Sequence, residues 1–387
     1  MRSESHDLHS FSTTRISGRI VDQHFPPGHA VPVSSENFDC QKQGADDGES
    51  GHQSPKLSVI VLNHNGIRFV ERCINSIVAT NYANLEVIIV DNASKDGSYE
   101  LLVHITADRP EVRLIRSDDN LGYSGGNNLG YSHASGDIVV FLNVDTEVSP
   151  CSLRELVTVF NSAKTIAVVQ PKLLSLSQKG VLDSEGGYLD RMGYVYTLGN
   201  WYGVKPVGIG PDPFYAEGAA LAIKREVLED VLLEHVPFDD DYFAYYEDSD
   251  LCWRVRLMGF RVAHAPKSIV YHHRSYVTAQ LSFNAVYHFT KNHLSTLVKN
   301  YDVRNLVTWL PLVVFFEMIR GLLFLRTKPE NSWAKLLAFI WCLRNARRLF
   351  KKRGIVQSRI RRMPDSQVTK SMARPNFAPI LRNLVRP

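Results

Sequence analysis

The sequence predicts an α/β fold with a mostly parallel sheet, flanked by helices and followed by a helical C-terminal extension. From residue 57 onward, short runs of β-branched apolar residues alternate with segments of helical periodicity, as in sheets that are buried on both faces. Beyond about residue 280 the strand-like runs cease and the pattern becomes helical. A chain of 387 residues, 44% of them hydrophobic, is long enough for one large domain with appendages.

Composition divides the chain into four parts. Residues 1–54 are polar and are expected to form a disordered N-terminal tail. Residues 55–280 form the α/β domain, 281–362 a helical and basic extension, and 363–387 a C-terminal tail. No apolar run begins the chain, so the α/β domain is expected to lie in the cytoplasm. The net charge of +4 does not indicate a nucleic-acid partner.

The first half of the α/β domain reads as four strands with helices between them. Strands are expected at 57–62, 85–90, 112–115 and 137–142. Helices are expected at about 67–80, from the turn at 91–96 to about 106, and at 124–133. Regular alternation of this kind is typical of right-handed crossovers in a parallel sheet.

The second half of the domain is less regular. A helix at 150–162, strands at 167–170 and 219–223, and a helix at 225–232 are expected around a Gly- and Tyr-rich stretch, 184–216. A helix at 248–258 ends at Gly259, a residue suited to close a helix. Short strands follow at 261–264 and 268–271.

The extension contains two apolar helical segments and a basic block. Residues 306–325 are apolar but interrupted by Pro311, Glu317 and Arg320, and 333–343 form a second apolar segment. Residues 344–362 contain nine Lys or Arg and no acidic residue. This pattern favours an interfacial or re-entrant helix over a bilayer span, with the basic block on an anionic membrane surface. The alternative is an ordinary helical bundle on the α/β domain, with a solvated basic tail.

Polar residues follow the first two strands. Ligands of parallel α/β sheets bind at the carboxyl ends of the strands. Asn63 and Asn65 are therefore candidates for contacting a ribose or a base, and Asp91 for accepting a hydrogen bond from a pyrimidine or a ribose hydroxyl. The alternatives are a simple turn at Gly66 and a helix cap at Asp91. The G-x-G-x-x-G pattern of a dehydrogenase is absent after the first strand.

Two further candidate sites follow the third and fourth strands. The Gly-rich turn at 120–128 opens a helix, and helix N-termini attract phosphates; its candidate residues are Asn120, Gly122, Gly126 and Asn127. Asn143 and Asp145 follow the fourth strand. Mg²⁺ and Mn²⁺ prefer oxygen ligands such as the Asp145 carboxylate, and Asn143 occupies the first position of a D-x-D pattern.

The last candidates are a carboxylate pair and a histidine. Glu247 and Asp248 open a helix beside the aromatic run 242–246. The helix dipole alone can explain acidic residues there, Asp250 included. His272 and His273 are adjacent on a strand, so at most one of them faces the site. Carboxylates and a histidine so arranged can hold a divalent metal and supply a base for displacement chemistry on a sugar diphosphate.

Taken in order, these segments resemble family 2 glycosyltransferases, the inverting enzymes of GT-A fold, and especially their rhamnosyltransferase-like branch. The resemblance covers about residues 57–280, and its segments are 58–63, 90–97, 120–128, 141–145, 238–251 and 270–275. The loop 183–190 also resembles one that this branch carries between its two halves.

The resemblance implies a role for each part of the site. It implies a nucleotide-sugar donor, dTDP- or UDP-linked with rhamnose favoured, and a Mg²⁺ or Mn²⁺ cofactor bound by Asp145 and His272. It implies that Asp248 is the catalytic base, with Glu247 beside it. The acceptor is expected to be a glycan or a lipid-linked glycan, in cell-surface polysaccharide biosynthesis at the cytoplasmic face of the plasma membrane.

Two other functions compete with this one. A catalytically inactive GT-A domain could serve as a membrane-attached glycan-binding or assembly subunit, although the intact Asp145, Glu247, Asp248 and His272 speak against it. A sugar nucleotidyltransferase would want a Gly-rich basic loop directly after the first strand, and residues 63–66 do not provide one.

Overall fold

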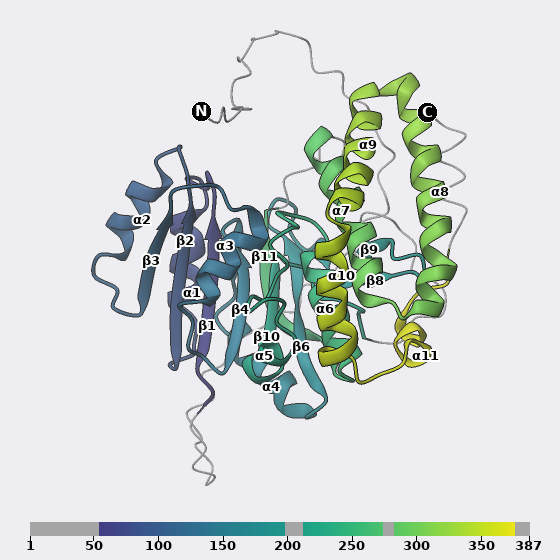
Figure 1. The fold of residues 1–387 in the computed structure, drawn as a ribbon. Coiled ribbons are helices and arrows are strands. Elements are labelled where there is room, and N and C mark those ends of the chain that lie inside the picture. The colour runs from purple at the N-terminus through teal and green to yellow at the C-terminus, as the bar shows by residue number, and fades with distance from the viewer. Residues whose placement is uncertain (1–53, 198–211, 274–281, 376–387) are drawn as a thin grey trace, which may run out of the picture.

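The structure is a computed structural model that describes residues 54–197, 212–273 and 282–375 (Figure 1). The expected N-terminal tail lies outside the described residues except for Ser54, and so do parts of the stretch 184–216 and of the C-terminal tail.

A parallel sheet forms the first half of the domain, as the alternation predicts. Strand β1 (Leu57–Asn63) pairs in parallel with β2 (Leu85–Asn92) and β4 (Ile138–Asn143), and β2 pairs in parallel with β3 (Val112–Ser117). The helices between them are α1 (Val70–Val78), α2 (Ser98–Thr106) and α3 (Gly122–Tyr131). The carboxyl ends of β1, β2 and β4 therefore meet at one edge of the sheet.

The second half turns the sheet into a mixed one. Strand β10 (Ala220–Lys224) pairs antiparallel with β4, and β6 (Ile166–Ser175) continues the sheet toward β11 (Arg261–His272). The two strands expected at 261–264 and 268–271 are one strand. Its register shifts between Ala265 and Ile269, around Pro266, which has no N–H to donate to the ladder. Strand β5 (Thr146–Val148) pairs with the end of β11, which brings His272 opposite Thr146, one residue after Asp145.

Short elements complete this domain. Helices α4 (Ser152–Ser162), α5 (Arg225–Asp230) and α6 (Glu247–Leu257) lie close to their predicted positions. The stretch expected to be irregular contains β8 (Gly187–Leu189) and β9 (Val195–Thr197), which pair with each other, while β7 (Leu182–Ser184) pairs with β6. Buried apolar side chains form a core on each face of the sheet, and α6 lies within one of them, with Trp253 fully buried.

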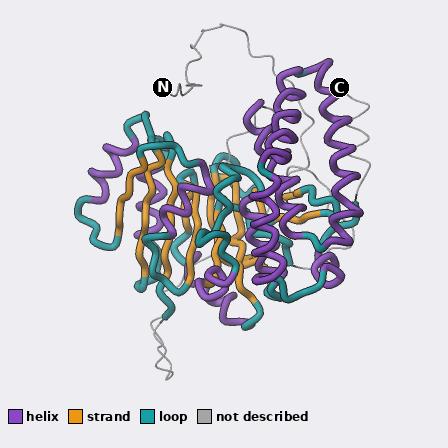
Figure 2. Tube along the Cα trace, viewed as in Figure 1, coloured by secondary structure: helices purple, strands orange, loops and turns teal. Residues whose placement is uncertain are grey.

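The C-terminal extension is helical (Figure 2). It comprises α7 (Phe283–Asn300), α8 (Val303–Thr327), α9 (Pro329–Arg344), α10 (Ala346–Ile355), a π-helical turn (Val356–Ile360) and α11 (Asp365–Val368). Helix α8 runs through Pro311 without a break, and α8 and α9 rise together beyond the edge at which β1 and β2 end (Figure 1).

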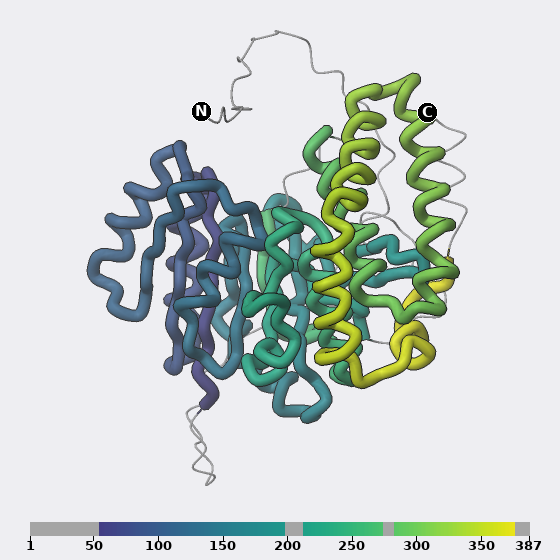
Figure 3. Tube along the Cα trace, viewed as in Figure 1, coloured from purple at the N-terminus to yellow at the C-terminus, as the bar shows by residue number. Residues whose placement is uncertain are grey.

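Buried ion pairs join this extension to the α/β domain. Lys299 of α7 and Lys352 of α10 both contact the Asp239 carboxylate, and Lys299 lies 3.2 Å from Asp250. Asp250 is fully buried, so its role is structural. Figure 3 shows α10, at the yellow end of the colour scale, against the green segment that carries these carboxylates.

These pairs change the expected picture of the basic block 344–362. Lys352 is buried, and Arg353 and Arg361 donate to backbone carbonyls of 298–301. A buried carboxylate needs a buried cation, and α10 supplies it. The block is therefore not a uniformly solvated tail; Arg344, Arg347, Arg348 and Lys351 are its exposed members next to α9.

Candidate active site

The polar side chains at the first two strand ends, Asn63 and Asp91, are buried. Asn63 donates from Nδ2 to Asp91 Oδ1 (2.8 Å) and to Ser98 Oγ (2.9 Å), and both Asn63 and Asp91 are fully buried. The Asp91 carboxylate also accepts from the backbone N–H of Ser94 (3.3 Å). Because buried polar groups must find partners, these two side chains hold the loop after β2 and do not lie open to a ligand.

The polar groups exposed at this edge belong to neighbouring residues. His64 Nδ1 lies 2.7 Å from the carbonyl oxygen of Asn92, and its Nε2 lies 3.1 Å from Asn65 Nδ2 and 3.2 Å from Asn120 Nδ2. Three exposed side chains from two loops thus form one cluster. Asn65 and Asn120 lie where the sequence predicts, and His64 is an addition.

The glycines of the 120–128 turn serve close packing. Gly122 has φ +70°, and a Cβ there would lie 2.4 Å from the carbonyl oxygen of Phe243. A Cβ at Gly126 would lie 2.4 Å from Leu62 Cδ1, so Gly126 lets α3 approach the sheet. Asn127 is also buried and donates to the carbonyl of Tyr123 within the helix.

Asp145 and His272 come together, as the proposed metal pair requires. His272 Nε2 lies 3.5 Å from Asp145 Oδ1, while His272 Nδ1 lies 2.8 Å from Asp183 Oδ2. The neighbouring His273 faces another way, its ring 4.9 Å from that of Phe69. Asn143 is half-buried, and its backbone N–H donates to the carbonyl of Ala219 (3.1 Å), which fixes the start of the loop to Asp145.

The donor set fits a divalent ion that is shared with a substrate. A carboxylate on one nitrogen of an imidazole orients the other nitrogen toward a metal, and Asp183 does this for His272. Burial disfavours the imidazolium, but hydrogen bonds to Asp145 and Asp183 outweigh it and raise the pKa of His272 to about 9, so a metal at Nε2 would have to displace a proton. Among the described residues, no group of three or more His, Cys, Asp or Glu side chains is placed to hold a metal ion.

Asp248 lies at the first turn of α6 with a backbone donor on each oxygen. Its Oδ2 accepts from the N–H of Gly218 (3.0 Å) and its Oδ1 from that of Ser249 (2.6 Å). Burial raises the pKa of Asp248 to about 7, and the charge of Glu217 adds to the rise. Burial and the neighbouring Asp248 also raise the pKa of Glu247, whose Oε2 has no hydrogen-bond partner among the described residues. A carboxylate with a pKa near neutrality is suited to accept a proton.

The loop before α6, residues 242–246, holds an unusual backbone. Phe243, Tyr245 and Tyr246 have φ of +63°, +73° and +71°, values that cost free energy in residues with a side chain. Asn292 of α7 restrains this aromatic loop: its Nδ2 lies 3.0, 2.8 and 2.7 Å from the carbonyl oxygens of Tyr242, Ala244 and Tyr245. The conformation that presents Glu247 and Asp248 therefore depends on the C-terminal extension.

The predicted aromatic walls are only partly present. Tyr242 and Tyr246 are buried, and their hydroxyls contact Thr296 and the carbonyl of Gly193. Phe243 is 39% exposed, and Tyr245 is half-buried. Only these two rings lie at the surface beside the carboxylate pair.

Besides His64, three residues of this site are absent from the sequence prediction of the site: Asp183, Glu217 and Asn292. Asp183 belongs to the 183–190 loop, but its contact with His272 depends on the pairing of β7 with β6. Glu217 precedes a strand whose neighbours could not be read from the sequence. Asn292 lies in α7, more than forty residues beyond the loop that it restrains. Because all three contacts are long-range, no local pattern indicates them.

Comparison with known proteins agrees with this geometry. Residues 58–186 match the family model for glycosyl transferase family 2. The chain is 27% identical over 209 residues to an uncharacterized glycosyltransferase of Nostoc sp., which covers 53% of this chain and 60% of that protein. It is 29% identical over 208 residues to the low-salt glycan biosynthesis hexosyltransferase Agl10 of Haloferax volcanii, covering 52% of this chain and 61% of that protein. The chain thus spans less than two thirds of the length of these relatives.

Solved structures with low sequence identity share the fold. GalNAc-T7, solved with UDP, GalNAc and Mn²⁺, superposes with a TM-score of 0.53 at 17% identity, over 65% of this chain and 49% of that one. TarS 1–349 of S. aureus, solved with UDP-GlcNAc, superposes with a TM-score of 0.50 at 16% identity, over 81% of this chain and 89% of that one. The fold is the GT-A fold: a mixed, curled sheet flanked by helices, here with a helical C-terminal region.

Proposed function

We propose that this protein is an inverting glycosyltransferase that moves a sugar from a nucleotide-diphosphate donor to a hydroxyl group of a glycan. The observation that carries the proposal is that a candidate base and a candidate metal-binding pair lie at the same edge of the sheet. One is a carboxylate, Asp248, with a pKa near neutrality; the other is the Asp145–His272 pair, oriented by Asp183. The match of residues 58–186 to family 2 supports it.

Asp248 is the base in this mechanism. The N–H groups of Gly218 and Ser249 fix the orientation of its carboxylate. In its ionised form it takes the proton of the acceptor hydroxyl while that oxygen attacks the anomeric carbon from the face opposite the diphosphate. One displacement inverts the configuration, and no covalent sugar–enzyme intermediate is formed. Burial and the charge of Asp248 raise the pKa of Glu247, which favours its neutral form beside the base.

Asp145 and His272 hold the divalent metal in this proposal. When bound, Mg²⁺ or Mn²⁺ neutralises negative charge on the leaving diphosphate. His272 offers Nε2, because Nδ1 is engaged by Asp183, and Asp145 offers a carboxylate oxygen. The diphosphate would supply further ligands, because the described residues offer only these two. GalNAc-T7 was solved with Mn²⁺, which is consistent with this choice of ion.

The nucleotide and sugar are proposed from resemblance. UDP and UDP-GlcNAc accompany the two solved structures described above, and the rhamnosyltransferase-like motifs favour a dTDP- or UDP-linked donor with rhamnose as the sugar. His64, Asn65 and Asn120 are the exposed polar groups at the sheet edge that are available to a ribose or a base. Cell-surface polysaccharide assembly is the process we assign, and the name of Agl10 is consistent with it.

We also propose attachment to the cytoplasmic face of the plasma membrane through α8. Among the described residues α8 is the one helix long and apolar enough to cross a membrane, yet only 11% of its most apolar window is buried. Its outward stripe includes Val307, Phe315 and Leu322, exposed by 68%, 57% and 64%. An apolar face of this size in water is unusual and is typical of a lipid or protein contact.

Glu317, in the middle of α8, points the opposite way. Glu317 is buried, accepts from the Tyr194 hydroxyl (2.9 Å) and from Arg320 (3.1 Å), and contacts the ammonium of Lys335 in α9. A charge held inward and apolar groups held outward suit a helix that lies in the membrane interface. This arrangement favours a peripheral attachment over a span. In a span, the ion pairs of Glu317 would have to lie inside the hydrocarbon layer.

A screen of nucleotide sugars tests the catalytic proposal. Thermal unfolding with Mn²⁺ and each of a panel of dTDP-, UDP- and GDP-sugars should reveal one donor that stabilises the protein. That donor should then be hydrolysed or transferred, and Asp248→Asn should abolish turnover while keeping the stabilisation. Stabilisation without turnover in the unmodified protein would instead favour the inactive glycan-binding subunit.

A further inference from the structure

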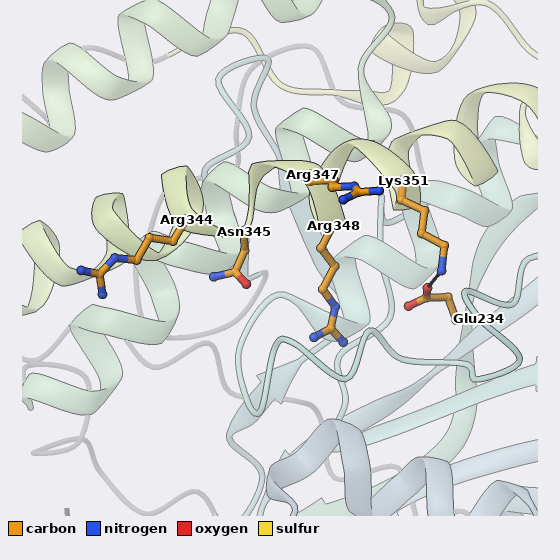
Figure 4. A pocket seen from close by; sticks show the side chains of 6 residues that line it. All are labelled: Glu234, Arg344, Asn345, Arg347, Arg348 and Lys351. Atoms are coloured by element: carbon orange, nitrogen blue, oxygen red, sulfur yellow. Dashed lines mark hydrogen bonds and ion pairs between the residues drawn. The ribbon is translucent and has the colours of Figure 1, made fainter. Parts of the chain in front are cut away.

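A groove with an aromatic half and a basic half runs along the extension. The aromatic half, about 350 Å³, lies between α7 and α9 and includes Tyr287, His288, Leu337, Ile340 and Trp341. The basic half, about 600 Å³, lies along the α9–α10 junction and opposite the loop that carries Glu234 (Figure 4). Arg344 and Asn345 line both halves, so the two are continuous.

The basic half carries an excess of positive charge. Arg348 lies 3.0 Å from Asp241, and Lys351 lies 2.6 Å from Glu234. Arg344 and Arg347 are exposed and have no ion-pair partner within the described ranges. Four cations thus face two carboxylates. Figure 4 shows Lys351 turned to Glu234 and Arg344 extended away from it. Guanidinium groups suit the oxygens of phosphates.

The aromatic half presents rings that are held in place. The Lys291 ammonium lies 4.8 Å from the ring centroid of Trp341 and 5.6 Å from that of Tyr287. The same ammonium donates to the carbonyl of Asp241, so it does not compete with a ligand. Fixed aromatic faces are suited to stack on sugar rings, because each ring buries apolar C–H groups while hydroxyls at the rim stay in water.

The groove leads to the proposed catalytic groups. His288 in the aromatic half stacks on Phe243 at 5.2 Å between ring centroids, with 22° between the planes. The carbonyl of Phe243 accepts from the N–H of Ser124 (3.1 Å) at the start of α3. Phe243 is also part of the aromatic loop that ends at Glu247. A ligand in the groove therefore borders on the loop that presents the base.

We propose that this groove binds the acceptor and that the acceptor is a glycan bearing a phosphate or diphosphate. Its terminal sugar reaches Asp248, its next part lies over Tyr287 and Trp341, and its phosphate contacts Arg344 and Arg347. The assignment rests on the proposed function, because it names the acceptor of that same reaction. The phosphate belongs either to a lipid carrier or to a phosphorylated soluble glycan. Both would present the same phosphate oxygens to the groove.

Equilibrium binding of three probes to the full-length protein, without donor or metal, tests the proposal. The probes are glucosyl diphosphate carrying an alkyl chain, glucosyl diphosphate without a chain, and the neutral alkyl glucoside. The double variant Arg344→Glu/Arg347→Glu should bind both diphosphates at least about tenfold more weakly, equivalent to a loss of about 1.4 kcal/mol. Its binding of the neutral glucoside should stay the same.

The matched control is Lys164→Glu/Lys267→Glu, which makes the same change of charge at two exposed residues away from the groove. It should bind all three probes as the unmodified protein does, and thermal unfolding should show that both double variants are folded. Tighter binding of the diphosphate with a chain identifies a lipid carrier, and equal binding of the two diphosphates identifies a soluble phosphorylated glycan.

Three results would overturn the proposal: equal weakening in the control, unchanged diphosphate binding in the groove variant, and binding of the neutral glucoside as tight as that of the diphosphates. The measurement contains no donor. The groove proposal can therefore be wrong while Asp248→Asn still loses transfer. Equally, the groove proposal can be right if the transferase proposal is wrong.

Discussion

At the scale of single residues, the base is the sharpest assignment to test. Asp248→Asn keeps an acceptor oxygen for only one of the N–H groups of Gly218 and Ser249, places an NH₂ donor against the other, and cannot take a proton. We expect transfer to fall about 10²–10⁴-fold. Donor binding, measured by thermal stabilisation, should remain within a few-fold. Transfer within about tenfold of the unmodified enzyme would remove Asp248 from this role.

The raised pKa of Asp248 predicts a pH dependence of both activity and stability. Activity should increase about tenfold per pH unit below pH 7 and level off above it, because only the ionised carboxylate accepts a proton. The folded state holds this proton up to a higher pH than the unfolded state, whose pKa is near 3.8. Its contribution to stability is therefore present at low pH and is lost as the pH rises from about 4 to 7.

Asp248→Asn removes this pH-dependent loss. The melting temperature of the variant relative to the unmodified protein should therefore increase between pH 4 and pH 8. A difference in melting temperature that stays constant over this range would show that the carboxyl is not perturbed by burial.

Metal binding is tested at Asp145. Asp145→Asn should weaken the Mn²⁺-dependent binding of a nucleoside diphosphate by about tenfold or more, since one of two protein ligands is impaired. Isothermal calorimetry with UDP or dTDP, with and without Mn²⁺, measures the change. Glu147→Gln, two residues further on and paired with the surface residue Arg72, is a control that should bind as the unmodified protein does. Full transfer in the presence of EDTA would exclude the metal mechanism.

At the scale of elements, α7 is expected to act on the site through the aromatic loop. Asn292→Asp keeps the size of the side chain but removes both donors, so three carbonyls lose their partner. We expect kcat to fall at least about tenfold with little change in donor affinity, because the loop that orients Asp248 is released. The pH at which activity is half-maximal should also move, since Asp248 becomes more solvated.

A variant in the same helix but away from the loop separates positioning from stability. Ser295→Ala removes a hydrogen bond to the carbonyl of Lys291 within α7 and leaves the aromatic loop's contacts in place. It should change neither the pH profile nor kcat. If Asn292→Asp lowers the melting temperature but leaves kcat and the pH profile unchanged, Asn292 is only a structural residue.

The elements near the sheet edge were predictable where local pattern decides structure. Strands β1, β2 and β4 are buried runs of β-branched residues, so their positions and their common edge follow from the sequence. The meeting of Asp145 with His272 depends on β11 pairing with β5, and that pairing could be expected only through resemblance. The burial of Asn63 and Asp91 was not predictable, because a polar residue at a strand end serves equally as ligand or as loop support.

At the scale of the whole molecule, the outward stripe of α8 predicts membrane binding. The triple variant Phe315→Gln/Met318→Gln/Leu322→Gln changes side chains that are each more than half exposed, so the fold should be kept. We expect the unmodified protein to sediment with anionic liposomes at low salt and the variant to lose most of this binding. Val103→Gln, at an exposed apolar position on α2, is the control.

This design is preferable to deletion of the extension. A chain that ends near residue 300 lacks Lys352, and the Asp239 carboxylate would then lose one of its two buried partners. Breaking a buried ion pair in this way costs several kcal/mol. If the triple variant binds liposomes as the unmodified protein does, the α8 stripe does not face lipid and is available for a protein partner.

The attachment of the catalytic loop to α7 and α10 has a consequence for protein synthesis. A ribosome that has released the chain only to about residue 280 has completed every strand of the sheet, but the cations and the amide that restrain residues 239–246 are still unmade or inside the exit tunnel. A nascent chain can thus form the sheet edge proposed to bind the donor before it can fix the loop that orients Asp248. In the proposed mechanism the base is organised only after Lys352 has emerged, well after β11 is complete, so shorter nascent chains are not expected to consume donor.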